Sequence, residues 1–127
     1  MRKKEEDVLD NNDIRVVELL SEIGVSRNLA KTLMYISQVK ECRSADIERG
    51  ADLRQPEVSV SIKNLQNRGW VKKRDLKNNL KGRPIHIYNV TKDLSEILKV
   101  FENEKLEEIE NIKNDISELK NIISNKK

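Results

Sequence analysis

The side chains of this sequence that could do chemistry are mostly cations, and they gather in one stretch of the chain. Between Arg54 and Arg83 there are nine basic side chains against two acidic ones, a net charge of +7. The whole chain carries only +3, so the remaining residues sum to −4. The basic residues of the stretch are Arg54, Lys63, Arg68, Lys72, Lys73, Arg74, Lys77, Lys81 and Arg83. A clustered basic patch is the usual footprint of a phosphate-binding surface, although a solvated surface can also be basic.

A helix is predicted at residues 55–68, within this basic stretch, and it has an apolar and a polar side. Val58, Ile62 and Leu65 form the apolar stripe at helical spacing. Pro56 lies in the first turn, where its missing N–H costs nothing. The polar side is therefore left free to meet a partner.

The polar side of this predicted helix carries groups that can contact a DNA duplex. Gln55 can form two hydrogen bonds with adenine in the major groove, and the alternative is an ordinary solvated helix start. Ser59 can contact a base or a phosphate, and Val60 can contact a thymine methyl group. Lys63 and Arg68 suit phosphates, which fix the register without reading sequence. We expect the glutamine, the serine and the lysine to contribute most.

Two strands joined by a basic loop are predicted after the helix. Gly69 ends the helix because glycine adopts a positive φ without steric cost. Residues 70–74 then form one strand, and residues 85–90 form the strand that returns. In the loop between them, Gly82 lets the chain turn and Arg83 can enter a minor groove, unless the loop is a simple hairpin.

The first of these strands is basic. Lys72 and Arg74 can line the approach to phosphates, whereas alternation in a strand points Lys73 away from them. The predicted DNA-binding residues are therefore Arg54, Gln55, Pro56, Ser59, Val60, Lys63, Arg68, Lys72, Arg74, Lys81, Gly82 and Arg83.

Helices that could position this surface are predicted upstream of it. They cover residues 14–22, residues 27–39 and the short segment 45–49. Asn12 or Asp13 can cap the first helix and Ser26 the second, while Gly24 separates the two. The order helix, short helix, turn, helix is that of a helix-turn-helix, and the following hairpin makes a wing.

The end of the chain predicts one long helix. Residues 92–127 contain neither proline nor glycine, and Thr91 can cap them. Apolar residues step by 3, 4, 3 and 4 from Ile109 to Ile123, which is a coiled-coil seam, and one 11-residue interval extends it towards Leu98. A helix of roughly 50 Å cannot bury this stripe on a small domain, so we expect a homodimer, unless the second half of the helix frays. The predicted dimerisation residues are Leu98, Phe101, Leu106, Ile109, Ile112, Ile116, Leu119 and Ile123.

Composition excludes several other functions. Apolar residues make up 36% of the chain, and none of their runs approaches the ~20 residues that cross a bilayer. No signal-peptide pattern begins the chain, so we expect a cytoplasmic protein without a membrane partner. A single cysteine, Cys42, cannot form an internal disulfide, and with His86 it makes no metal site. Trp70 suits the core or its rim. No cofactor, nucleotide loop or nucleophile–base pair is indicated, so the sequence does not predict an enzyme.

Several segments resemble one group of proteins. IGVSRNLAK at residues 23–31 resembles the corresponding segment of the TrmB-like winged-helix regulators of archaea and bacteria. LRQPEVS at 53–59 and LQNRGWV at 65–71 look like the recognition helix and first wing strand of the wider MarR, ArsR and TrmB group. KGRPI at 81–85, with Tyr88, resembles that group's wing.

This resemblance covers about residues 14–91 and implies a dimeric transcription regulator of archaeal type with a dimer-forming terminal helix. Full-length TrmB regulators add a sugar-binding domain, so no effector pocket carries over to this chain. Metal-sensing ArsR proteins use cysteine pairs, which this sequence lacks. Arg54 stands where the group often has a serine or threonine cap; arginine cannot accept an N–H, but it can place a charge at the DNA backbone instead.

The sequence therefore predicts a mainly α fold with a small β-hairpin wing (α+β), a winged helix-turn-helix followed by a long coiled-coil helix. We expect a flexible N-terminus at 1–12, a DNA-binding domain at 13–91 and a dimerisation helix at 92–127. The predicted function is sequence-specific, homodimeric regulation of transcription on double-stranded DNA. The alternative is a protein-interaction module of a transcription or replication assembly that docks through its C-terminal helix. RNA is disfavoured because its A-form major groove is too narrow for a helix.

Overall fold

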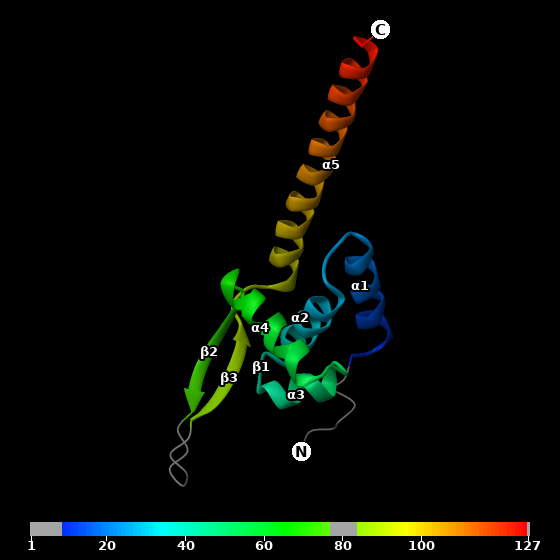
Figure 1. Cartoon of the computed structure of the whole chain (residues 1–127). Helices are drawn as coiled ribbons and strands as arrows, with labels where there is room; N and C mark the ends of the chain where they lie inside the picture. The colour runs from blue at the N-terminus through cyan, green and yellow to red at the C-terminus, as the bar shows by residue number, and fades with distance from the viewer. Residues whose placement is uncertain (1–8, 77–83, 127) are drawn as a thin grey trace. The chain divides into compact units, whose positions relative to one another are not determined.

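The computed structural model describes residues 9–76 and 84–126, and the chain divides into two compact units, 1–93 and 94–127 (Figure 1). In its described part, the first unit holds four helices and a three-stranded antiparallel sheet. The second unit is one long helix. The fold is thus mainly helical with a small sheet, as the sequence predicted. None of the helices in the described ranges is long and apolar enough to span a bilayer.

The first helix, α1 (Asn11–Glu22), begins three residues earlier than predicted because its cap is Asp10. The Asp10 carboxylate accepts the backbone N–H of Asp13 at 2.9 Å, and the Asp13 carboxylate accepts the N–H of Asp10 at 2.9 Å. This reciprocal pair is a capping box, so the prediction of Asn12 or Asp13 as the cap was wrong. Gly24 follows the helix with φ of 101°, as a helix stop requires.

The second helix, α2 (Arg27–Val39), lies at the centre of the unit. Ser26 caps it as predicted, because its hydroxyl accepts the N–H of Leu29 at 3.3 Å. Leu33 and Ile36 are fully buried, and the helix contacts α1, α4 and the sheet. It therefore supplies the core against which the other elements pack.

The short helix α3 (Ser44–Gly50) leads into α4 (Gln55–Asn67), which is the predicted recognition helix. Arg54 precedes α4 without a side-chain cap, and its N–H is instead accepted by the Glu57 carboxylate at 2.8 Å. The predicted apolar stripe of α4 is buried, and Gly69 beyond its end has φ of +79°. The helix is thus held by its apolar side and ended by a glycine, as the sequence predicted.

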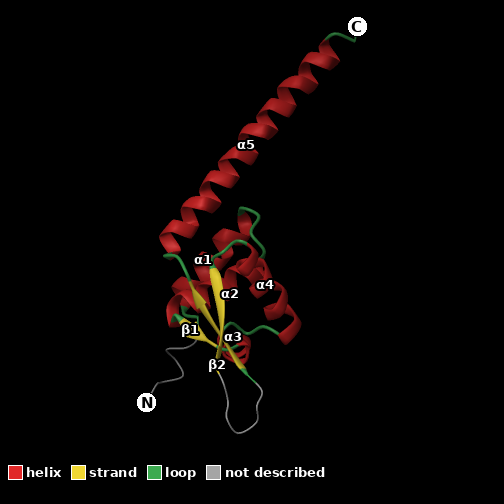
Figure 2. Ribbon diagram, turned by 90° about the vertical axis from the view of Figure 1, so that its left-hand side faces the viewer, coloured by secondary structure: helices red, strands yellow, loops and turns green. Residues whose placement is uncertain are grey.

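The sheet has the strand order β1-β3-β2 and lies along one side of the helices (Figure 2). Its strands are β1 (Glu41–Cys42), β2 (Val71–Leu76) and β3 (Ile85–Val90). β2 and β3 pair in antiparallel register, from Val71 opposite Val90 to Leu76 opposite Ile85. The sequence predicted β3 correctly, displaced β2 by one or two residues at its ends, and missed β1.

The base of the β2–β3 hairpin is closed by Thr91. Its hydroxyl donates to the carbonyl of Gly69 at 2.6 Å, and its N–H donates to the carbonyl of Trp70 at 2.8 Å. The prediction that Thr91 caps the last helix was wrong, since that helix begins at Leu94. Trp70 is 4% exposed and lies under the Arg68 guanidinium, 4.6 Å from the ring centre, which confirms it as a core anchor.

The second unit, α5 (Leu94–Ser124), is a continuous helix of 31 residues. Ile97 and Phe101 are its buried residues. The remaining predicted dimerisation residues are exposed: Leu98, Leu106, Ile109, Ile112, Ile116, Leu119 and Ile123. Phe101 is only 2% exposed in the single chain, so the exposed apolar row of α5 consists of the other seven residues.

Candidate nucleic-acid interface

The candidate interface begins with the side of α4 that does not pack. Gln55, Ser59 and Lys63 are all exposed and follow one another at intervals of four residues, so they form one row along the helix. Val60 lies beside this row and is 70% exposed. Burial of the opposite stripe fixes the rotation of the helix, so these four side chains have to face outward. All four were predicted as DNA-binding residues from the sequence.

A groove of about 360 Å³ separates this row from the sheet. Its residues come from α4, from β3 and from the first residue of α3. They are Ser44, Gln55, Val58, Ser59, Ile62, Lys63, Gln66, His86 and Tyr88. The floor is apolar and the rims carry amide, hydroxyl, ammonium and imidazole groups, which can donate and accept hydrogen bonds.

Two side chains of the groove, His86 and Tyr88, were not predicted as contacts. They are two residues apart in β3, so they share the face of the sheet that packs towards the helices. His86 Nδ1 lies 2.7 Å from a carboxylate oxygen of Asp75, its partner across the hairpin. Burial, and after it the Asp75 carboxylate, raises the pKa of Tyr88, so its phenol stays a hydrogen-bond donor.

The register of the hairpin also determines on which face of the sheet each basic residue of β2 lies. Lys73 pairs with Tyr88 and therefore lies on the groove face, although it is not among the DNA contacts predicted from the sequence. Lys72 and Arg74 were selected but lie on the opposite face, opposite Asn89 and Ile87. Alternation predicted that Lys73 points away from its neighbours, but only the packing of the sheet shows which side meets α4.

Arg74 has an acidic neighbour from another strand, which the sequence alone does not indicate. Its guanidinium lies 2.9 Å from the Glu41 carboxylate of β1, and both side chains are about half exposed. A pair of this kind contributes at most about 1 kcal/mol, so the arginine can exchange this partner for a phosphate. Its contact with DNA stays a prediction.

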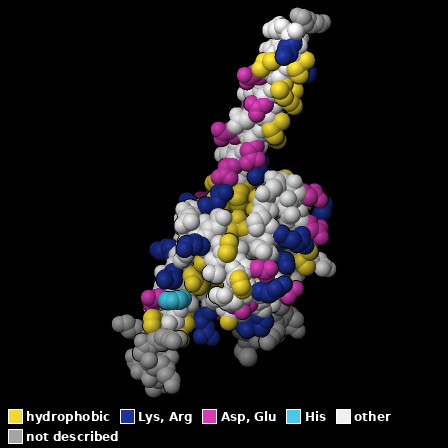
Figure 3. Space-filling model, viewed as in Figure 1, with side chains coloured by type: hydrophobic (Ala, Val, Ile, Leu, Met, Phe, Trp, Pro, Cys, Tyr) yellow, Lys and Arg dark blue, Asp and Glu magenta, His cyan; other side chains and the backbone are white. Residues whose placement is uncertain are grey.

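The other predicted contact residues are distributed around these elements. Arg54 and Pro56 are exposed at the start of α4, and Arg68 is exposed at its end. Lys81, Gly82 and Arg83 lie outside the described residues. In Figure 3, Lys and Arg side chains, dark blue, lie over the strands and also over the helices of the first unit.

Cys42 does not contribute chemistry to this surface. It is 6% exposed, and burial, with a smaller effect of Asp46, raises the pKa of its thiol to about 12. It therefore stays protonated and is a poor nucleophile. Among the described residues, no group of three or more His, Cys, Asp and Glu side chains is placed to hold a metal ion.

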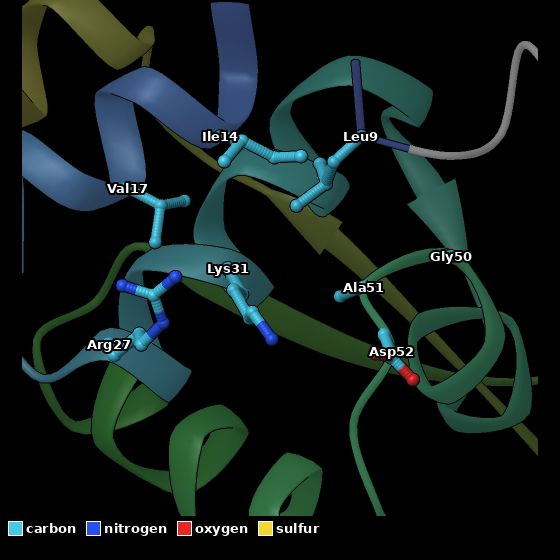
Figure 4. Close-up of a pocket in the computed structure, with 8 residues that line it drawn as sticks. All are labelled: Leu9, Ile14, Val17, Arg27, Lys31, Gly50, Ala51 and Asp52. Carbon is cyan, nitrogen blue, oxygen red and sulfur yellow. The ribbon is translucent and has the colours of Figure 1, made fainter. Parts of the chain in front are cut away.

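A second cavity, of about 230 Å³, lies between α1, α2 and the turn after α3 (Figure 4). Its walls are mostly apolar, and Arg27 and Lys31 of α2 stand at one side, one helical turn apart. Its lining residues are Leu9, Ile14, Val17, Arg27, Lys31, Gly50, Ala51 and Asp52. It shares no residue with the groove beside α4.

No known family model matches the sequence, and no curated protein matches it. Solved structures do match. A possible transcriptional regulator from Methanosarcina mazei Go1 is 10% identical, with a TM-score of 0.61 over 83% of this chain and 87% of its own. A MarR family transcriptional regulator from Silicibacter pomeroyi is 11% identical, with a TM-score of 0.52 over 91% of this chain and 82% of its own.

TrmBL2, an archaeal chromatin protein with a described mode of DNA binding, is 16% identical, with a TM-score of 0.53. The match covers 88% of this chain and 43% of TrmBL2. At these identities the likeness concerns the fold. The chain therefore has the winged helix-turn-helix fold of these regulators, with a long terminal helix.

Proposed function

We propose that this protein is a double-stranded DNA-binding transcription regulator that acts as a homodimer. The observation that carries the proposal is the exposed row on α4, which borders a groove with polar rims while the other side of the helix is buried. A helix presented in this way fits the major groove of B-DNA, which is wide enough to admit it. The regulators that share the fold support the same reading.

The contacts would divide into two kinds. Gln55 and Ser59 can reach base edges, and Val60 can meet a thymine methyl group. Lys63, in the same row, and Lys73, on the groove face of β2, would neutralise phosphates, so affinity should fall steeply as salt rises. In a dimer, two copies of α4 would read half-sites about one helical turn, roughly 34 Å, apart, so the operator would be an inverted repeat.

The test is the affinity of the purified chain for duplex DNA, random and from its own promoter, measured across a salt series. Lys63→Ala should weaken binding to every sequence alike and lower the slope of log affinity against log salt by about 1. Gln55→Ala should instead reduce the preference for the promoter, by about 1–3 kcal/mol at the base it reads. Arg15→Ala, which removes one positive charge from α1, is the charge-matched control. Salt-independent binding, or variants indistinguishable from this control, would contradict the proposal.

The homodimer rests on the exposed apolar residues of α5. Seven of the predicted dimerisation residues are between 47% and 65% exposed in the single chain. Exposing such a row of apolar side chains to water is unfavourable, and in coiled coils a second helix covers it. Sedimentation of the intact chain should give twice the mass of 14.8 kDa.

The same apolar row favours one other function. α5 could dock the chain onto a larger transcription or replication assembly, with the winged helix serving as a protein-interaction module. This alternative is supported if variants of Gln55, Ser59 and Lys63 bind DNA with unchanged affinity while removal of α5 abolishes a protein complex.

A further inference from the structure

The apolar row of α5 follows a strict heptad in its second half. Ile109, Ile116 and Ile123 occupy the a positions, and Ile112 and Leu119 occupy the d positions, so these five residues form the α5 seam. Their exposed fractions range from 47% to 65%. Figure 3 shows the hydrophobic side chains gathered along one edge of the helix. The seam has the geometry that a second helix of the same kind would fill.

Charged residues flank the seam with opposite signs on its two sides. Glu108 and Asp115 occupy the g positions, and Lys113 and Lys120 occupy the e positions; all four are exposed. Glu108 also pairs with Lys105 of the same helix, at 3.2 Å. At the two ends of the seam, the flanking positions hold the exposed apolar residues Leu106 (e) and Ile122 (g). One flank of the helix is therefore acidic and the other basic.

This arrangement discriminates between the two directions in which helices can pair. In a parallel pair, each g residue faces the e residue of the next heptad on the other chain. Glu108 would then face Lys113 of the second copy, and Asp115 would face Lys120, which gives four attractive pairs per dimer. In an antiparallel pair, g faces g and e faces e, so carboxylate would meet carboxylate and ammonium would meet ammonium.

We infer that α5 pairs in parallel and in register with α5 of a second copy, through the α5 seam and these four charge pairs. The inference rests on the homodimer proposed above and adds its direction. Parallel pairing sets the two Leu94 residues about 10 Å apart, the usual distance between packed helices. An antiparallel seam centred near residue 114 would separate them by about 60 Å. Since only residues 91–93 join β3 to α5, the parallel form tethers both DNA-binding units at one end.

Disulfide trapping tests the direction. In a parallel dimer the two residues at position 123 are opposite each other, so Ile123→Cys should form a disulfide-linked dimer in a glutathione redox buffer. In an antiparallel dimer the same positions lie about 27 Å apart, beyond the ~7 Å that a disulfide can bridge. The wild type is the control, because its buried Cys42 should not cross-link.

A mixture of two further variants would reveal antiparallel pairing if it occurred. Ile109→Cys and Leu119→Cys should each link to their own kind when mixed and oxidised, because the pairing is in register. A predominant disulfide between positions 109 and 119, identified by mass spectrometry, would overturn the parallel inference and leave the homodimer intact. Sedimentation of the wild type as a monomer would overturn both. DNA binding by the same preparation shows separately whether the proposed interaction with DNA stands.

Charge reversal gives a second, independent readout. Lys113→Glu with Lys120→Glu should raise the dimer dissociation constant about tenfold or more, because four attractions become repulsions. Adding Glu108→Lys and Asp115→Lys should restore tight pairing. In an antiparallel dimer the first pair of changes would merely exchange one like-charge contact for another and leave the constant unchanged. Circular dichroism checks that each variant remains helical, and a trimer in sedimentation would contradict the dimer.

Discussion

At the residue scale, the register of the β2–β3 hairpin decides which basic side chains can act together. Lys73 shares the groove face with Tyr88 and with the His86–Asp75 pair, whereas Lys72 and Arg74 lie on the other face beside Glu41. Adjacent lysines in a strand thus meet different surroundings. The groove face adjoins the exposed row of α4, so its lysine is the better placed to share a DNA ligand with that helix.

The first prediction compares these two lysines. Lys73→Ala should lower DNA affinity about three- to tenfold at moderate salt, because it removes a phosphate contact next to α4. Lys72→Ala removes the same charge from the same strand and should have a smaller effect. Fluorescence anisotropy with a labelled duplex measures both. Equal losses would mean that net charge, and not the groove face, governs binding.

The second prediction concerns Cys42. Its pKa is raised to about 12, so the folded chain should have almost no thiolate at pH 8, and iodoacetamide should react at least about a hundredfold more slowly than with the unfolded chain. Because the folded pKa exceeds the usual 9.0, its contribution to stability is complete below pH 9 and is lost between pH 9 and about 12. Denaturant titrations should show this loss, and it should be absent in Cys42→Ala. Rapid alkylation of the folded chain would contradict the assignment.

At the element scale, the sequence predicted most of the helices because their apolar residues repeat at helical spacing and glycines end them. It misplaced the start of α1, where Asp10, Asn12 and Asp13 are all good capping types and only the capping box selects among them. It missed β1, because a strand of two residues, Glu41–Cys42, has no pattern of its own and exists only by pairing with β3. The groove could likewise not be predicted from the sequence, because it depends on which face of the sheet packs against the helices.

The third prediction tests the cap. Asp10→Ala should reduce the free energy of unfolding by about 1 kcal/mol, because it leaves the Asp13 N–H at the start of α1 without its acceptor. Asn12→Ala, at one of the two positions that the sequence predicted as the cap, should reduce the free energy of unfolding by only a few tenths of this amount, since the first turn of a helix tolerates alanine. Urea denaturation followed by circular dichroism measures the difference. Equal costs would argue against the capping box.

At the scale of the whole molecule, the chain combines a small globular unit with a helix whose seam it leaves exposed. In the proposed dimer this helix would determine how strongly the unit binds DNA. Two linked half-sites bind together far more tightly than either alone, because the second contact becomes intramolecular. Affinity for an operator should therefore depend on residues far along the sequence from α4.

The fourth prediction separates folding from assembly. Ile116→Lys places a charge at the centre of the α5 seam and should convert the dimer to a monomer in sedimentation. Its affinity for a two-site operator should fall at least about a hundredfold, while its affinity for a single half-site stays near the wild-type value. Asn114→Lys, which adds the same charge at an exposed position outside the seam and its charged flanks, is the control. A monomer that kept full operator affinity would remove the link between dimerisation and DNA binding.

The two hydrogen bonds that Thr91 makes at the base of the hairpin bear on how force would pass along the chain. Thr91 holds the carbonyls of Gly69 and Trp70, directly after α4, and α5 begins three residues later along the same chain. A force applied to α5 would therefore act on the C-terminal end of α4 and on both strands of the β2–β3 hairpin. In the proposed dimer, only residues 92 and 93 would lie between this hydrogen-bonded site and α5, so little chain would separate the fold that meets DNA from the helix that meets the second copy.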